Sequence, residues 1–217
     1  MIPVVIHADA FSNAGKAAMA PEGALHGKAC RRYLILGRAL IGVCAAFAVA
    51  MCGFISYNLH DGHVAGEASG RIVHAWDGLD VSMEGGEAVA KDGDDCYIGI
   101  VAIPSLGIEL PVNREWSTAA AKQSPCRYTG SVAESDLTIA AHNFGTQFGG
   151  IHRLMPGDVV TFTDTRGMAY KYEVAYTEIL EGTDVAKMQE GDWDLTLFTC
   201  TIGGRQRVTV RCQYADL

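Results

Sequence analysis

Apolar residues are concentrated in one stretch near the start of the chain. Positions 33 to 57 are almost continuously apolar, and after Arg38 an uncharged run of 19 residues extends from position 39 to position 57. A helix rises about 1.5 Å per residue, so this run covers roughly 28 Å, close to the roughly 30 Å hydrocarbon core of a bilayer. The pattern predicts a transmembrane signal-anchor helix over residues 33–57, which would tie the protein to the membrane.

Charged residues of opposite sign flank the predicted anchor. Basic residues precede it and acidic residues follow it: Lys28, Arg31, Arg32 and Arg38 on one side, Asp61 and Glu67 on the other. Because positively charged flanks stay on the cytoplasmic side, the N-terminus is expected in the cytoplasm and everything after residue 57 outside the cell. The chain is therefore predicted to be a single-pass protein of the cell membrane.

The same segment offers two alternatives to a retained anchor. Ala48, Val49 and Ala50 form a small-residue site that a signal peptidase could cut, but the apolar run continues seven residues past Ala50 and a long segment precedes it. Lipidation of Cys52 is disfavoured, because Met51 stands where the lipidation motif needs a small residue. We favour the retained anchor and keep cleavage as the alternative.

The segments on either side of the anchor lack a sustained hydrophobic period. Residues 1–32 are predicted to form a disordered cytoplasmic tail. Residues 58–95 contain seven glycines and nine acidic residues, which is typical of a flexible, acidic, Gly-rich linker. This linker contains one short apolar cluster that could instead dock on the following domain, formed by Trp76, Leu79, Val81 and Met83.

From residue 96 onward the pattern changes to short runs rich in Val, Ile, Thr and Tyr. Seven such runs are predicted to be strands, at 97–104, 108–112, 136–142, 158–164, 169–177, 194–200 and 207–214. Turn signals such as Pro156-Gly157 and Arg166-Gly167 separate them. The spacing predicts an all-β fold, a closed barrel over residues 96–217, rather than alternating strands and helices.

Charge and cysteine usage narrow the class of protein. The net charge of −8 argues against nucleic acid as a partner, since phosphate binding needs an excess of Lys and Arg. No two of the seven cysteines have C-x-x-C spacing and the histidines add no ligand pattern, so we expect no metal site and no cofactor. A disulfide between two of Cys96, Cys126 and Cys212 stays open for a domain outside the cell.

Three residues at strand ends have the chemistry of acyl transfer. Cys200 ends an alternating strand, His142 ends an apolar run that enters a Gly-rich loop, and Arg207 opens the last strand. A thiol that attacks a carbonyl needs a means to hold the thiolate, a proton shuttle and a donor for the oxyanion. Each residue alone is more often structural or simply solvated, but the combination favours a catalytic site.

The sequence TLFTC at 196–200 resembles the TLxTC signature of sortases, the membrane-anchored cysteine transpeptidases of Gram-positive cell surfaces. Residues 98–104 resemble the family's opening strand, and Ala141-His142-Asn143 resembles its histidine strand. Residues 154–158 resemble the turn before its central strands, and Arg207 leads a final strand as in the family. The resemblance covers residues 96–217 and leaves the subclass undetermined.

The resemblance implies a fold and a role for each of these residues. It implies a closed eight-stranded sortase-type β-barrel with short helices or loops, preceded by one N-terminal transmembrane helix. Cys200 would be the nucleophile, His142 the general acid and base, and Arg207 the oxyanion donor, with Arg205 as its nearby rival. Thr199 is a secondary candidate for contact with the oxyanion or the substrate.

The resemblance also implies the reaction and its partners. An LPxTG-like sorting signal would be cleaved between Thr and Gly, and the protein transferred through a thioacyl intermediate to an amine acceptor such as a cell-wall precursor. Its partners would be surface proteins that bear C-terminal sorting signals, with residues 178–193 as a wall over the signal. The Asp-Pro-aromatic lid pattern of pilin-polymerising sortases is absent, which favours cell-wall anchoring.

Two other functions fit the same residues. An extracytoplasmic Cys/His peptidase would use the same nucleophile and base to hydrolyse cell-wall or surface peptides. A non-catalytic β-barrel binding module would use neither residue chemically. Formation of an acyl adduct and transfer to an amine distinguish the three functions.

Overall fold

The computed structural model of the chain describes residues 22–215, which fall into two compact units with the division between Phe54 and Ile55. The helix α1 (Glu22–Ala75) supplies the described part of the first unit. Its side chains from position 33 to position 54 are all exposed, and the helix is long and apolar enough to cross a membrane. Of the predicted disordered tail, residues 22–32 are helical, and residues 1–21 lie outside the described residues.

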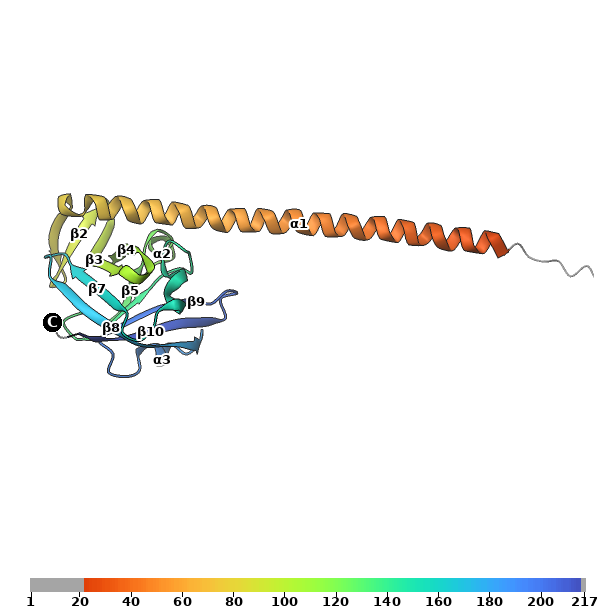
Figure 1. Ribbon diagram of the computed structural model, residues 1–217. Helices are drawn as coiled ribbons and strands as arrows, with labels where there is room; N and C mark the ends of the chain where they lie inside the picture. Colours follow the sequence, from red (N-terminus) through yellow and green to blue (C-terminus); the bar gives the residue numbers. More distant parts are fainter. Residues whose placement is uncertain (1–21, 216–217) are drawn as a thin grey trace, which may run out of the picture. The chain divides into compact units, whose positions relative to one another are not determined.

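The second unit contains a closed barrel, as the strand spacing predicts, and it has eight strands, as the resemblance implies (Figure 1). Around the ring its strands are β3 (Asp95–Ile103), β4 (Ile108–Asn113), β5 (Cys126–Thr129), β6 (Leu137–Ala140), β9 (Leu195–Cys200), β10 (Gln206–Tyr214), β8 (Ala169–Glu181) and β7 (Val159–Asp164). Pairing of β7 with β3 closes the ring. The β4–β5 and β6–β9 pairs are parallel and the other pairs are antiparallel.

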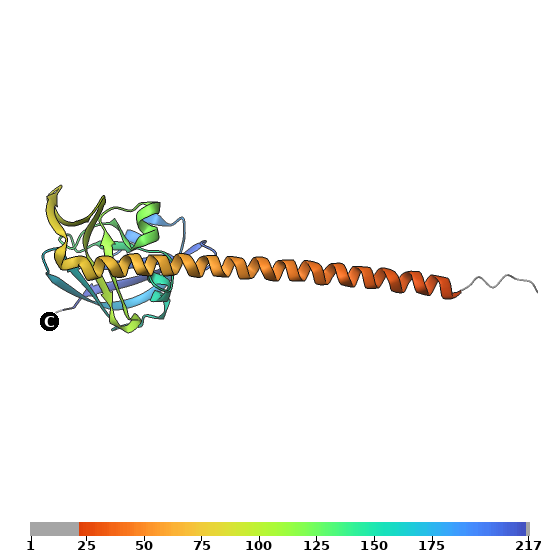
Figure 2. The same ribbon diagram turned by 90° about the horizontal axis from the view of Figure 1, so that it is seen from above.

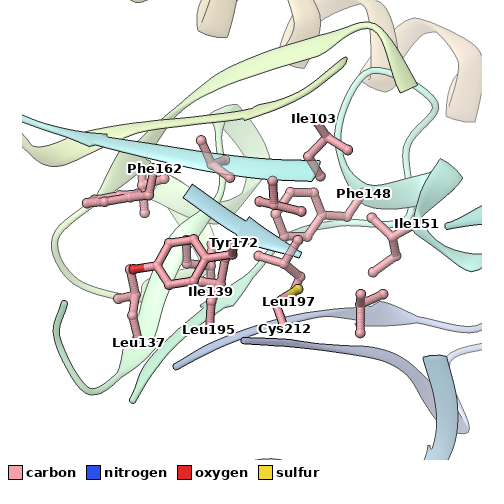
Figure 3. Close-up of a cluster of buried hydrophobic side chains, with 14 of the residues drawn as sticks. Ile103, Leu137, Ile139, Phe148, Ile151, Phe162, Tyr172, Leu195, Leu197 and Cys212 are labelled. Carbon is pink, nitrogen blue, oxygen red and sulfur yellow. The ribbon is translucent and has the colours of Figure 1, made fainter. Parts of the chain in front are cut away.

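The barrel interior is an apolar core to which every strand except the short β5 contributes buried side chains (Figure 3). Leu195 and Leu197 of β9 point into it, as do Val208 and Val210 of β10. Phe148 and Ile151 come instead from the short helix η3 (Phe148–Arg153). Because side chains alternate along a strand, every second side chain points to the outer face of the barrel, where it can line a surface site.

The segment 58–95, predicted to be a flexible linker, is ordered. Its first part continues α1 to Ala75, and the rest forms the short helix η1 (Trp76–Gly78) and the hairpin β1 (Asp80–Glu84) and β2 (Glu87–Asp92). The hairpin extends the sheet beside β3 (Figure 2). Gly85 and Gly86 have positive φ and form its turn, so part of the glycine content belongs to tight turns.

Two residues of the apolar cluster in this segment pack on the domain and the other two are exposed to solvent. Trp76 and Leu79 pack against the buried Ile72, Ala90 and Tyr97, which is the docking alternative. The other two members, Val81 and Met83 on β1, are exposed. Ion pairs add to the attachment: Glu84 and Glu87 of the hairpin pair with Arg114, which directly follows β4, and Glu87 also pairs with Arg127 within β5.

The described cysteines are free thiols, so the disulfide that the sequence left open is not formed in the structure. Cys126 and Cys212 are buried and Cys96 is half-buried. Burial raises the pKa of the Cys126 thiol to about 11 and that of the Cys212 thiol to about 12. Both are therefore protonated, inert core side chains at neutral pH.

Candidate active site

The pairing of three strands brings the predicted site residues into one row. In the parallel β6–β9 pair, Ala140 lies opposite Phe198, and two residues further along each segment come His142 and Cys200. In the antiparallel β9–β10 pair, Arg207 lies directly opposite Cys200. Residues separated by 58 positions in the sequence thus end on adjacent segments at the same end of the barrel.

The row lies on the outer face of the barrel. Leu195 and Leu197 of β9 enter the core, so Phe198 and Cys200 have the parity of the outer face. On β10 the core residues are Val208 and Val210, which gives Arg207 the same outward parity. The site is consequently accessible without any opening of the core.

A cavity of about 170 Å³ joins these residues. Cys200, His142, Arg207 and Thr199 all line it. The rest of its lining is mainly apolar: Trp116, Ala121, Tyr128, Ala140, Ala141, Gly182, Met188 and Phe198. A larger cavity of about 450 Å³, between the β1–β2 turn and the β7–β8 turn, contains none of the predicted site residues. The candidate site is therefore a small apolar cleft with a thiol, an imidazole and a guanidinium at its edge.

The backbone around His142 is held by its own loop. Its N–H donates to Gln147 Oε1 at 2.9 Å, and its carbonyl accepts from Phe148 N at 3.2 Å. The imidazole is stacked on the ring of Phe144, with centroids 5.1 Å apart and planes 26° from parallel. Burial lowers the pKa of His142 below its ordinary value, and the positive charge of Lys122 lowers it further. The ring is thus more completely neutral at pH 7 than a solvated histidine.

This shift predicts the titration of His142. Measured by NMR, its midpoint should lie below the ordinary value of about 6.5, and Lys122→Gln should raise it. The pKa of His142 is lower in the folded chain than in the unfolded chain. The contribution of the neutral ring to the free energy of unfolding is therefore complete above the unfolded-state pKa, and it is lost as pH falls through the folded-state pKa. Lys91→Gln on β2 is the control and should leave the midpoint unchanged. An unshifted midpoint in the wild type would contradict this environment.

Thr199 has a partner other than substrate. Its side chain is buried, and its hydroxyl donates to the carbonyl of Ala141 at 2.8 Å. Ala141 N in turn donates to Phe198 O at 3.2 Å. Thr199, which was predicted to contact the substrate or the oxyanion, thus lines the cavity, and its hydroxyl ties β9 to the residue before His142.

The two candidate arginines differ in position. Arg207 is half-buried, lines the cavity and donates from Nη1 to the carbonyls of Gly204 and Gln206, at 2.9 and 3.1 Å. Arg205 is exposed and is not part of the cavity lining. The positions favour Arg207 as the arginine of the site.

The predicted wall, residues 178–193, contains a short helix held by a buried arginine that the sequence did not single out. The helix α3 (Val185–Gln189) carries Met188, which is buried and lines the cavity. Arg211 is only 2% exposed and donates to the carbonyls of Lys187 and Met188, to Thr196 Oγ1 and to Glu178 Oε1. The only indication in the sequence was its position on β10, where alternation places Arg211 on the outer face of the barrel. Arg211 fixes the cavity wall through the α3 backbone.

Loss of Arg211 should therefore destabilise the fold. Arg211→Ala leaves the carboxylate of Glu178 and two helix carbonyls without this donor, at a cost of roughly 3 kcal/mol. For a domain of this size that corresponds to a melting temperature lower by roughly 6–12 °C. Arg166→Ala, whose side chain is 73% exposed, is the control and should change it little. Equal melting temperatures for the two variants would contradict this role of Arg211.

No group of three His, Cys, Asp or Glu side chains within the described part of the chain could hold a metal ion. A thiol beside an imidazole and a guanidinium can form and release an acyl group.

Comparison with known proteins identifies the family. A family model described as the sortase domain matches residues 101–215, and no curated protein matches the chain. Sortase A of Corynebacterium diphtheriae, as a lid mutant, is 23% identical over 58% of this chain and 73% of its own, with a TM-score of 0.51.

Two further solved structures share the fold. Sortase C1 of Streptococcus agalactiae is 22% identical over 56% of this chain and 68% of its own, with a TM-score of 0.51. The sortase D5 transpeptidase of Clostridium perfringens is 18% identical over 71% of this chain and 99% of its own, with a TM-score of 0.54. These identities establish the fold and leave the subclass undetermined. The matched domain covers more than half of the chain and includes the candidate site, so the chain belongs to the sortase family.

Proposed function

We propose that this protein is a cysteine transpeptidase that cleaves an LPxTG-like sorting signal between Thr and Gly and transfers the acyl group to an amine of the cell wall. The observation that carries the proposal is the convergence of Cys200, His142 and Arg207 on one cavity. The charge pattern around the apolar helix supports a single-pass membrane protein with a cytoplasmic N-terminus and an extracellular catalytic domain.

Acylation begins when the neutral imidazole of His142 accepts the thiol proton of Cys200, and the resulting thiolate attacks the carbonyl carbon of the substrate's Thr-Gly bond. The carbonyl oxygen becomes an oxyanion, which the guanidinium of Arg207 stabilises. Collapse of this intermediate breaks the C–N bond, and His142 gives a proton to the leaving amine. The product is a thioester on Cys200 and a free peptide that begins with Gly.

Transfer repeats these steps with a different amine. The acceptor amine loses a proton to His142 and attacks the thioester carbon, again forming an oxyanion beside Arg207. Collapse forms an amide and releases the Cys200 sulfur, which takes its proton back from His142. The apolar lining of the cavity, with Met188 and Phe198, suits the Leu and Pro of a sorting signal and disfavours water near the thioester.

The full chain in detergent, incubated with an LPxTG-like peptide and a glycine-based amine, tests this proposal. The expected product is the new amide between the threonine and the added amine. Release of the threonine acid alone, with the amine present in excess, would support the Cys/His peptidase. Recovery of intact peptide after binding would support the non-catalytic module.

A further inference from the structure

The part of α1 that belongs to the second unit packs on the barrel through small residues. Ala65, Ser69 and Ile72 are buried, and the half-buried Gly62 and Gly66 share their helical face. Figures 1 and 2 show this part of α1 beside α2 (Thr118–Gln123) and the barrel, and Ser69 Oγ donates to Gln123 O at 2.8 Å. Each glycine in a helix interior costs roughly 0.5–1 kcal/mol relative to alanine, so their presence here calls for a reason.

The reason lies in the loop that follows His142. Thr146 Oγ1 donates to the carbonyl of Gly62 at 2.7 Å. A methyl group on Gly66 would lie 2.9 Å from Thr146 Cγ2, and one on Gly62 would lie 3.7 Å from Phe144 Cβ. The absence of a side chain at Gly66 leaves room for Thr146, which hydrogen-bonds directly to the helix backbone at Gly62.

The loop connects this helix contact to the imidazole. Phe144 lies beside the helix, with its Cβ 3.7 Å from where a methyl group on Gly62 would be, and its ring stacks on the ring of His142. Its carbonyl accepts from Gln147 N at 3.0 Å and from Gly149 N at 2.8 Å, which makes the loop a tight unit. Gln147 also accepts from His142 N. A displacement of Phe144 or Thr146 by the helix would therefore move the support of the imidazole ring.

We propose that residues 58–75 of α1 are a positioning element for His142, acting through Phe144 and Thr146. The proposal rests on the proposed function for its effect on transfer, while the contacts themselves are independent of it. Phe144 is a positioning residue, since it acts through the imidazole on which it stacks. The catalytic domain in this view includes the helix segment that follows the predicted membrane span.

The ring's titration reports this positioning separately from activity. Cys200 and Arg207 share the cavity with His142, and Lys122 is the charged residue that lowers its pKa after burial. The helix segment adds Asp61, which is half-buried, and the exposed His63 and Glu67. Substitutions of uncharged residues by uncharged residues add and remove no charge, so a change in the pKa of His142 would reflect a displaced ring, through its burial or its distance from Lys122.

A matched pair of glycine substitutions in the full chain provides the test. Gly66→Leu places a side chain against Thr146, whereas Gly70→Leu enters open space on the same helix, with the same gain in helix propensity. For Gly66→Leu, kcat/KM for transfer should fall by roughly 10- to 100-fold through kcat, as expected for a misplaced catalytic group. The NMR midpoint of His142 should rise toward its ordinary value. Gly70→Leu should match the wild type in both measurements.

Substitutions of Phe144 provide a second measurement from the loop side. Phe144→Ala removes the stacked ring and should raise the His142 midpoint, while Phe144→Tyr keeps the ring and should restore the wild-type value. An unchanged midpoint in folded Gly66→Leu and Phe144→Ala proteins would overturn the positioning role. If the wild type fails to transfer while the midpoint moves as expected, the proposed function fails and the positioning role stands.

Discussion

Replacement of Cys200 by alanine is expected to lower the rate of acyl transfer by roughly 10⁴-fold or more, because this thiol forms the covalent intermediate. The side chain is half-buried at the end of β9, so its loss removes little packing. The melting temperature should therefore stay close to that of the wild type. The measurement is the rate of amide formation from a sorting-signal peptide and an amine.

Cys96→Ala is the matched control for the cysteine prediction. Cys96 is also a half-buried free thiol, but it does not line the cavity. Transfer by this variant should equal that of the wild type. Retained transfer in Cys200→Ala, or its loss in Cys96→Ala, would mean that the nucleophile has been assigned to the wrong residue.

The second large effect is expected at Arg207. Arg207→Ala should lower kcat for transfer by roughly 10²–10³-fold, the effect of removing an oxyanion donor. Arg207→Lys should recover only part of this loss, since an ammonium lacks the forked donors of a guanidinium. The kinetics of peptide cleavage at saturating substrate measure the change.

Arg205→Ala is the control for Arg207 and should leave most of the activity. Arg205 is exposed and lies outside the cavity lining, although it is only two residues away. A severe loss in Arg205→Ala together with near-normal activity in Arg207→Ala would show that the assigned register of β10 is wrong at the active site.

The strands that line the site could be predicted because their patterns are local. Each of the seven predicted strands is present, since alternating β-branched residues mark one buried face. The one barrel strand that was not predicted, β5, has four residues, and its pattern is too short to detect. Cys200, His142 and Arg207 could be singled out as strand ends, but their adjacency depends on the parallel β6–β9 pairing, which no local pattern encodes.

The helix and hairpin of segment 58–95, and their packing on the barrel, could not be predicted from the sequence, and the reason is physical. The part of α1 in this segment packs on the barrel largely through Gly62, Ala65, Gly66 and Ser69, whose small side chains give no hydrophobic period. The same glycines that suggested flexibility permit close packing in the fold. Phe144 was missed similarly, because a single aromatic residue in a Gly-rich loop carries no signal of the ring on which it stacks.

Mass spectrometry of the full chain after exposure to a sorting-signal peptide, with no amine added, tests the central claim most directly. The account predicts an adduct with the mass of the peptide's acyl part on Cys200, which a strong amine nucleophile removes and which is absent from Cys200→Ala. Cleavage of the peptide with no acyl group on Cys200, or an identical adduct in Cys200→Ala, would contradict it.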